Sequence, residues 1–264
     1  MEGKAKRDVG FPGDRMVFEV SAVPTGSGED VQWSGGGDPP AGKGATFGTV
    51  FPRGGVYAVT ARCNDSSVHF TATICPIDEW MTRASSFYGP SLDLSRARVK
   101  GSRVVFGPAG MGWTCNSVIR FKRPHRAEDL PRESTLIHEL GHVWEHQSGR
   151  AQLLRGLFEQ TGRLLGRDPY DFGGPGGVKG AAKLTEFSME SQAEILMEYW
   201  KSQNGYSADS RGILFSTPGY VTDLRRLVDE AGIGTREAAP QRTIAATVDS
   251  LVARLVNTIL RPFD

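Results

Sequence analysis

The stretch HELGHVWEHQ, residues 138–147, places two histidines and a glutamate in the HExxH arrangement, as His138, Glu139 and His142. On an α-helix, residues four apart lie on one face about one turn apart, so both imidazoles reach one metal ion while Glu139 leans into the same space. Two nitrogen ligands and a carboxylate suit zinc. The stretch therefore predicts a helix that carries part of a Zn²⁺ site, with His138 and His142 as metal ligands and Glu139 as a catalytic residue.

The hydrophobic pattern around this stretch is helical, and it stays helical to the end of the chain. Apolar residues recur at three- and four-residue spacing from Glu133, and Gly149 ends the run. Further amphipathic helices are expected at 150–166, 184–203, 218–232 and 243–260. Between two of them lies a Gly-rich stretch, DPYDFGGPGGVKGAAK at 168–183, which is too irregular to predict as an element.

The first part of the chain has the pattern of β-strands. Short alternating, β-branched runs separated by turn residues occur at 15–22, 30–33, 44–50, 55–63 and 67–74. They suggest a small β-sandwich. The stretch FPRGGVYAVTARC, 51–63, resembles a strand of bacterial immunoglobulin-like and PKD-like modules, with Trp33 as a core tryptophan.

A helix at 76–89 leaves this region, and strands are expected at 97–100, 103–107 and 117–121, with the loop PAGMGWTCN at 108–116 between the last two. A domain boundary is expected here, giving a β-sandwich over residues 1–76 and a second domain over 77–264. The strand SVIRF, 117–121, is a candidate for binding an extended substrate by edge pairing.

Composition excludes several classes of function. Lys and Arg total 31 and Asp and Glu total 30, so the net charge of +1 gives no global field for binding nucleic acid or an anionic membrane. The sequence shows neither a secretory signal nor a membrane-spanning stretch, which makes the cytoplasm the default location. Three cysteines weaken a disulfide framework. A Cys63–Cys75 pair across adjacent strands stays open, and Cys115 is expected to be a buried, inert thiol.

A working zinc site needs a third protein ligand. His146 continues the four-residue spacing, but it lies about 12 Å along the helix axis from His138, too far to share one ion. It is expected on the helix surface or behind a ligand. No later histidine exists, so the ligand must be an acid, and one helix face downstream supplies four: Glu186, Glu190, Glu194 and Glu198.

The wider sequence resembles a known family. STLIHELGHVWEHQSG, then GRDPYDF and FSMESQAEILMEYW, is similar to gluzincin-like HExxH metallopeptidases and to the vgr-related zincin-like domains found beside contractile injection and type VI secretion genes. The similarity spans residues 134–200 and departs from the family pattern where Glu145 replaces a glutamine. The resemblance implies a mainly helical zincin-like domain with a small antiparallel sheet, Glu190 as the third ligand and Glu194 as the acceptor behind a ligating histidine. The pair Glu194 and Glu198 is the shifted alternative.

Together these features predict an α+β protein that acts as a zinc endopeptidase, with Glu139 as general base and a peptide or protein substrate. A tyrosine is expected to stabilise the oxyanion. Tyr199 is the first choice, with Tyr170, Tyr206 and Tyr220 left open. The alternative is a catalytically weak zinc-binding scaffold that serves as cargo or tip component of a bacterial injection apparatus. The resemblance implies such apparatus proteins as partners and export without a signal peptide.

Overall fold

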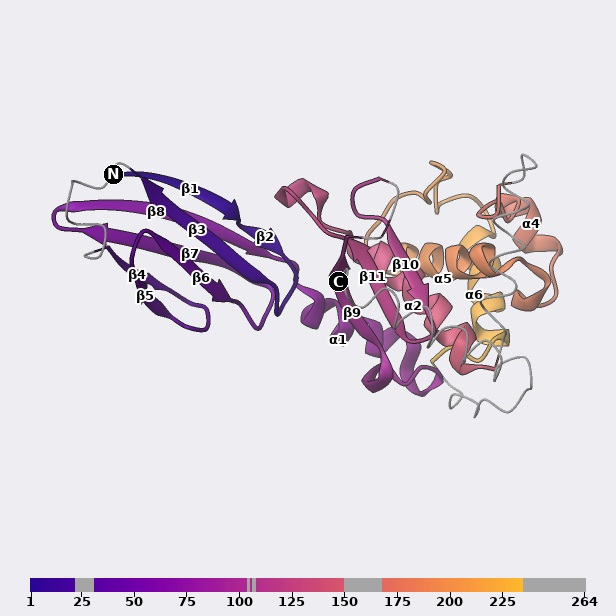
Figure 1. The fold of residues 1–264 in the computed structure, drawn as a ribbon. Helices are drawn as coiled ribbons and strands as arrows, with labels where there is room; N and C mark the ends of the chain where they lie inside the picture. The colour runs from indigo at the N-terminus through magenta and orange to yellow at the C-terminus, as the bar shows by residue number, and fades with distance from the viewer. Residues whose placement is uncertain (22–30, 104, 106–107, 150–167, 235–264) are drawn as a thin grey trace. The chain divides into compact units, whose positions relative to one another are not determined.

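The computed structural model describes residues 1–21, 31–103, 105, 108–149 and 168–234. Within them the chain is a mixed α+β protein with several sheets and five α-helices, as the sequence predicts (Figure 1). The chain divides into two compact units: Met1–Trp80 with Lys100–Met111 and Phe121–Pro131, and Met81–Val99 with Gly112–Arg120 and Arg132–Asp264. The domain boundary expected after residue 76 stays a prediction.

The described strands of the first 80 residues form two sheets. One has the order β1-β3-β6 and the other the order β2-β8-β7-β4-β5. The strands are β1 (Glu2–Arg7), β2 (Val9–Gly10), β3 (Arg15–Ser21), β4 (Gln32–Gly35), β5 (Ala41–Lys43), β6 (Thr46–Val50), β7 (Gly55–Cys63) and β8 (Ser66–Ile74).

One hydrophobic core lies between these sheets. Alternate side chains of β3 enter it, where Met16, Phe18 and Val20 are buried. Trp33 of β4 lies in the same core, with its ring stacked on Phe47 at 5.5 Å between centroids. The core position predicted for Trp33 is therefore confirmed.

The five predicted strands of this region are present as β3, β4, β6, β7 and β8, although residues 22 and 30 lie outside the described part. The pattern does not indicate β1, β2 or β5. The sequence of β1, EGKAKR, is mostly polar, and β2 and β5 have only two and three residues. Strands this short or this charged carry too little alternation to be recognised, and they form because a neighbouring strand pairs with them.

The three cysteines are buried and form no disulfide, so the pairing left open for Cys63 and Cys75 is not made. The register of the antiparallel β7–β8 pair explains this. Cys63 lies opposite Ser66 at one end, whereas Cys75 follows Ile74, which lies opposite Gly55 at the other end. The length of β8 separates the thiols. Cys115 is 1% exposed, as expected for a buried thiol.

A small sheet of order β10-β11-β9 precedes the motif helix, formed by β9 (Arg98–Ser102), β10 (Gly112–Cys115) and β11 (Val118–Lys122). β10 lies inside the stretch predicted as a loop, so that prediction is wrong. Asn116 has a φ of 56° and supplies the left-handed residue that a tight β10–β11 turn needs. The strand predicted at 103–107 is absent at its described residues.

The position of β11 in the middle of this sheet also overturns one functional expectation. Both of its edges are occupied, by β10 and by β9. SVIRF therefore cannot pair with a substrate, and among the described strands β10 lies at the edge of the sheet on that side.

The described α-helices are α1 (Ile77–Tyr88), α2 (Glu133–Gln147), α4 (Gly174–Gly180), α5 (Met189–Gln203) and α6 (Tyr220–Glu230), and the short 3-10 turns are η2 (Gly89–Ser91), η3 (Leu94–Arg96), η4 (Ala127–Asp129) and η5 (Leu184–Glu186). The helices expected at 76–89, around the motif, at 184–203 and at 218–232 are confirmed. Those expected at 150–166 and 243–260 lie outside the described residues.

The helices differ from the prediction in two respects. The Gly-rich stretch contains α4, which begins with Pro175 in its first turn, a position that tolerates proline. The helix predicted from residue 184 begins as α5 at Met189, because Ser188 caps it by accepting the Ser191 N–H at 3.1 Å. None of the described helices is long and apolar enough to cross a lipid bilayer.

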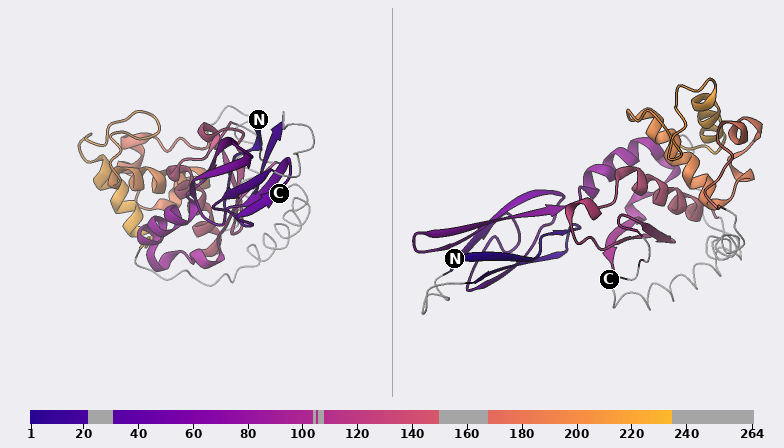
Figure 2. Two further views of the ribbon diagram at one scale, coloured as in Figure 1. Left: turned by 90° about the vertical axis from the view of Figure 1, so that its left-hand side faces the viewer. Right: turned by 90° about the horizontal axis from the view of Figure 1, so that it is seen from above.

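The helices α2 and α5 pack side by side (Figures 1 and 2). Gly141 lies at the contact, where an added Cβ would approach the Cα and Cβ of Ala193 to 3.1 Å. A glycine here allows the two helix backbones to come close. Because α5 covers one face of α2 and β10 another, α2 is buried almost all round, and His146 is 5% exposed. The surface position considered for His146 is therefore wrong.

Candidate metal centre

Two residues of α2 and one of α5 converge at one point. His138 Nε2 lies 3.3 Å from Glu190 Oε2, and His142 Nε2 lies 3.2 Å from the same oxygen. One ligand atom of each of the three residues lies within 4.8 Å of the other two. The spacing of the histidines follows from the helix alone, whereas Glu190 reaches them only because α5 packs against α2.

The donor set fits zinc in both chemistry and spacing. Two ligand atoms on a tetrahedral zinc ion, each about 2.0–2.1 Å from the metal, lie about 3.3 Å from one another. The two nitrogen–oxygen separations, 3.3 and 3.2 Å, match that value. Two imidazoles and one carboxylate would supply three of the four ligands of a tetrahedral zinc ion, the number of protein ligands found in catalytic zinc sites.

Each imidazole is also held at its other nitrogen by a buried or half-buried carboxylate. His138 Nδ1 lies 3.3 Å from Glu194 Oε2, and His142 Nδ1 lies 3.1 Å from Glu145 Oε2. Such contacts fix the ring orientation and leave Nε2 to face the metal. The sequence pointed to Glu194 but not to Glu145. The role of Glu145 could have been predicted from its position three residues after His142, where the family pattern has a glutamine.

These contacts shift the titration of the cluster in the metal-free protein. Burial acts to lower the pKa of His138, but hydrogen bonds with Glu190 and Glu194 outweigh it and raise the pKa to about 9. Burial likewise opposes the charged form of His142, yet the charge of Glu190 and the bond to Glu145 raise its pKa well above the ordinary value. Burial acts to raise the pKa of Glu190, but the two imidazoles lower it far below its usual range. The metal-free cluster is therefore an ion-paired group near neutral pH.

Glu139 faces β10. Its Oε2 accepts a hydrogen bond of 2.6 Å from the hydroxyl of Thr114, and a Cβ added to Gly112 would lie 2.6 Å from its Oε1. Alternate residues of a strand point to the same face, so Gly112 and Thr114 together form the surface on which the carboxylate rests. Trp113, between them, points away from this face. Glu139 itself is 6% exposed, which keeps it largely out of bulk water.

The acidic face of the downstream helix separates into four different roles. Exposed Glu186 accepts the N–H groups of Ala182 and Lys183 at the start of a 3-10 turn. Glu190 meets the histidines, and Glu194 lies behind His138. The fourth, Glu198, lies 3.0 Å from the ammonium of Lys201 and is buried. The alternative pair, Glu194 and Glu198, is therefore not the one that faces both imidazoles.

The four candidate tyrosines are not equally placed. Tyr199 lies nine residues after Glu190, about two and a half helical turns, and is therefore on the opposite face of α5. Its ring centroid lies 6.1 Å from that of Phe87. The structure does not bring Tyr199 to the histidines. Tyr170 does lie beside them, with its ring centroid 5.8 Å from that of His138.

The other two tyrosines lie elsewhere. The Tyr220 hydroxyl donates to Asp209 at 2.8 Å, and Tyr206 is exposed and packs on Trp200. Because Tyr170 is the only one of the four with a described contact to the motif, the placement favours it over Tyr199 for any role at the site.

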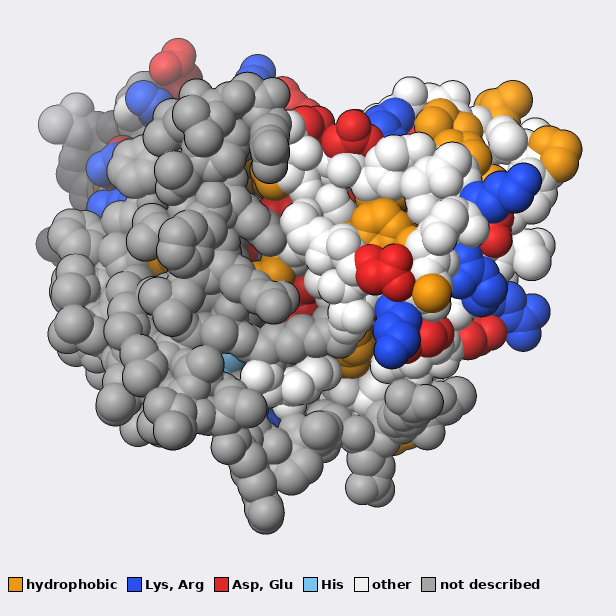
Figure 3. Space-filling view, turned by 90° about the vertical axis from the view of Figure 1, so that its right-hand side faces the viewer, with side chains coloured by type: hydrophobic (Ala, Val, Ile, Leu, Met, Phe, Trp, Pro, Cys, Tyr) orange, Lys and Arg blue, Asp and Glu red, His pale blue; other side chains and the backbone are white. Residues whose placement is uncertain are grey.

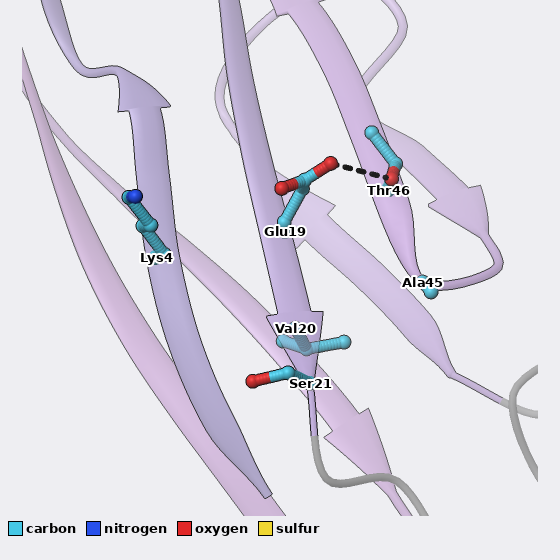
Figure 4. Close-up of a pocket in the computed structure, with 6 residues that line it drawn as sticks. All are labelled: Lys4, Glu19, Val20, Ser21, Ala45 and Thr46. Atoms are coloured by element: carbon cyan, nitrogen blue, oxygen red, sulfur yellow. Dashed lines mark hydrogen bonds between the residues drawn. The ribbon is translucent and has the colours of Figure 1, made fainter.

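A separate hollow of about 310 Å³ in the first unit contains none of these residues (Figure 4). It is lined by Lys4, Glu19, Val20, Ser21, Ala45 and Thr46. Its one carboxylate, that of Glu19, is paired with Lys6 and accepts a hydrogen bond from Thr46 at 3.4 Å. The hollow thus offers no group of metal ligands among its described residues.

Comparison with known proteins gives one relative. The chain is 30% identical over 151 residues to the type VI secretion system spike protein VgrG2b of Pseudomonas aeruginosa. The similar region covers 52% of this chain and 14% of that protein, so the chain spans only a small part of the relative's length. No protein-family model and no solved structure matches the chain.

Proposed function

We propose that this chain is a zinc-dependent endopeptidase that works as part of, or is carried by, a bacterial secretion apparatus. The observation that carries the enzymatic part is the convergence of His138, His142 and Glu190 beside Glu139. A structural zinc site usually has four protein ligands and needs no general base. Three ligands, with a glutamate directly after one of them in the sequence, are the composition of a hydrolytic site.

The residues of the chain divide the chemistry among themselves. Zinc bound by the two histidines and Glu190 would polarise a carbonyl and lower the pKa of a water molecule. Glu139 would act as general base, taking a proton from the attacking water and returning it to the leaving amine. Thr114 holds one oxygen of this carboxylate, so the other oxygen is the one that takes the proton. The ring of Tyr170, 5.8 Å from that of His138, makes this tyrosine the candidate donor to the oxyanion.

An extended peptide is the substrate that the local structure favours. β10 is an edge strand, and two of its residues contact Glu139. A peptide that adds to the free edge of β10 would run past the general base, and its main chain would be held by backbone hydrogen bonds. The proposal therefore places the scissile bond beside Gly112 and Thr114.

The second candidate is a zinc-binding component of an injection apparatus with little turnover. The similarity to a spike protein bears on association with a secretion apparatus and not on catalysis, and so by itself it supports this candidate more directly. In either case the first unit would be an immunoglobulin-like sandwich that docks the chain on apparatus proteins, and the second unit a zincin-like domain. On the described part of the face in Figure 3, acidic and basic side chains are interspersed, which suits a protein partner better than nucleic acid.

One experiment separates the two candidates. The full chain and its Glu139→Gln variant are loaded with zinc, the metal content is measured, and both are incubated with casein and with a peptide library. We expect zinc in both proteins and cleavage by the wild type alone. Zinc in both proteins without cleavage by either would favour the scaffold.

The ligand set has its own test. Glu190→Ala should lose zinc, because it removes the carboxylate that faces both imidazoles. The matched control is Glu186→Gln, which alters an exposed acid of the same sequence stripe and should keep zinc. Retention of zinc by Glu190→Ala would overturn the assignment.

A further inference from the structure

Two consecutive residues outside the motif, Ser210 and Arg211, contact groups on two sides of His138, and Asp209 beside them anchors the segment. We propose that this 209–211 segment is a positioning element for His138. Ser210 holds the carboxylates behind the imidazole, and Arg211 holds the stretch of chain that carries Tyr170. The inference rests on the proposed metal site and adds to it residues that neither the HExxH motif nor the glutamate face contains.

The first side is a buried chain of carboxylates. The backbone N–H of Ser210 donates to Glu198 Oε1 at 2.9 Å, and its hydroxyl donates to the same oxygen. Glu194 lies one turn earlier on the same face of α5. The Oε2 of Glu194 lies 3.3 Å from His138 Nδ1. Two carboxylates, those of Glu198 and Glu194, therefore lie between Ser210 and the imidazole.

The carboxylates behind His138 are shielded from water, so their positions depend on the groups that donate hydrogen bonds to them. The side chain of Glu198 is 1% exposed, and Lys201, 9% exposed, lies 3.0 Å from its Oε2. Burial acts to raise the pKa of Glu198, and the bonds from Ser210 and the charge of Lys201 only partly offset it. Carboxylates removed from water depend on such fixed donors. Ser210 is one of those donors, and the only one that comes from outside α5 among the described contacts.

The second side is the approach of Tyr170. The guanidinium of Arg211 lies 3.8 Å from the centroid of the Phe172 ring, and its Nη1 lies 3.3 Å from Asp171 Oδ1. These two residues directly follow Tyr170, whose ring centroid is 5.8 Å from that of His138. Arg211 thereby fixes the stretch that places the tyrosine beside the imidazole.

Asp209 anchors the segment itself. Its fully buried carboxylate accepts the Tyr220 hydroxyl at 2.8 Å and the backbone N–H groups of Arg211 and Ile213 at 2.9 and 2.8 Å. Because Tyr220 begins α6, these bonds fix the segment to a helix. Because the 209–211 segment is held in one conformation, it can fix the orientation of His138 through the residues between them.

The test compares Ser210→Ala, Ser210→Thr and Ser216→Ala in the full chain. Ser210→Thr keeps the hydroxyl at an exposed position, and Ser216→Ala is a matched exposed control in the same connection. Zinc affinity is measured by competition with a chromophoric chelator, and the visible spectrum of the Co²⁺-loaded protein reports ligand geometry. In the metal-free protein, ¹⁵N imidazole signals report the environment of His138.

We expect Ser210→Ala to weaken zinc binding about tenfold, as for other residues behind a metal ligand. We also expect it to change the Co²⁺ spectrum and to shift the His138 signals, with Ser210→Thr close to wild type and Ser216→Ala unchanged. Unchanged His138 signals in Ser210→Ala would overturn the inference whether or not zinc binds. Failure of the wild type to bind zinc would instead overturn the proposed function. Should Ser210→Ala not fold, Glu198→Leu removes the acceptor of the same bond and must give the same shift.

Discussion

The hydroxyl of Thr114 on β10 donates a hydrogen bond of 2.6 Å to Oε2 of Glu139 on α2. The motif brings Glu139 near the two histidines, but a helix alone leaves its carboxylate several rotamers. The edge strand selects one of them, with Oε2 on Thr114 and Oε1 against Gly112. The general base of the proposed reaction is thus oriented by a residue 25 positions earlier in the chain.

The first prediction follows from this bond. Thr114→Val keeps the shape of the side chain and removes the donor, so kcat for peptide hydrolysis should fall about tenfold through misplacement of the base. KM and zinc content should not change, because neither ligand nor substrate edge is altered. Thr114→Ser should restore kcat, and a Thr114→Val enzyme with wild-type kcat would show that the bond does not orient Glu139.

The second prediction concerns the contact of α2 with α5. Gly141→Val should destabilise the metal-free protein by about 1–3 kcal/mol, because the new side chain overpacks the contact with Ala193. It should also weaken zinc binding, since α5 carries Glu190. Denaturant unfolding and chelator competition measure the two effects.

The matched control for this change is Gly176→Val, where an added Cβ meets nothing within 4 Å. Adding Ala193→Gly to Gly141→Val should recover part of the zinc affinity by returning space to the contact. Full affinity in the single variant would mean that the helices tolerate a wider separation.

The third prediction concerns Glu145, the carboxylate behind His142. Glu145→Leu should weaken zinc binding about tenfold, because it removes the acceptor at Nδ1. Glu145→Gln should stay close to wild type, since its amide oxygen can accept the same Nδ1–H. Equal affinities for the leucine and glutamine variants would show that the contact does not orient the imidazole.

The fourth prediction is a dependence of zinc affinity on pH. In the metal-free protein the pKa of His138 is about 9, above its ordinary 6.5, so near neutral pH zinc must displace at least one proton. The apparent affinity should therefore rise with pH, by about tenfold per unit for each proton released, until the pH passes the folded-state pKa. Calorimetry in buffers of different ionisation enthalpy counts the protons directly.

The same pKa fixes the sign of a stability effect without metal. A raised histidine pKa stabilises the fold below about pH 6.5, the unfolded value, and this contribution is lost as the pH rises through about 9. Metal-free protein should thus unfold at lower denaturant concentration at alkaline pH. His138→Ala should flatten this dependence, and an unchanged profile in that variant would assign it to other groups.

The sequence anticipated much of the fold where a pattern is local. The strands β3, β7 and β8 alternate along their own length, and α2 and α6 carry their own helical periodicity. It missed β10, because GWTC has no alternation of its own, and it extended α5 backward past Ser188. β10 forms because β11 pairs with it. α5 begins only at Met189 because Ser188 caps the helix there.

The HExxH spacing of His138 and His142 belongs to the sequence by itself, since four residues make about one helical turn whatever surrounds the helix. The tertiary structure alone decided the rest. Glu190 faces both imidazoles because Gly141 lets α5 approach, Glu145 turns inward because α2 is buried on nearly every side, and Tyr170 rather than Tyr199 lies beside His138. Contacts between segments dozens of residues apart depend on how helices and strands pack, and the spacing of residues within one helix does not predict that packing.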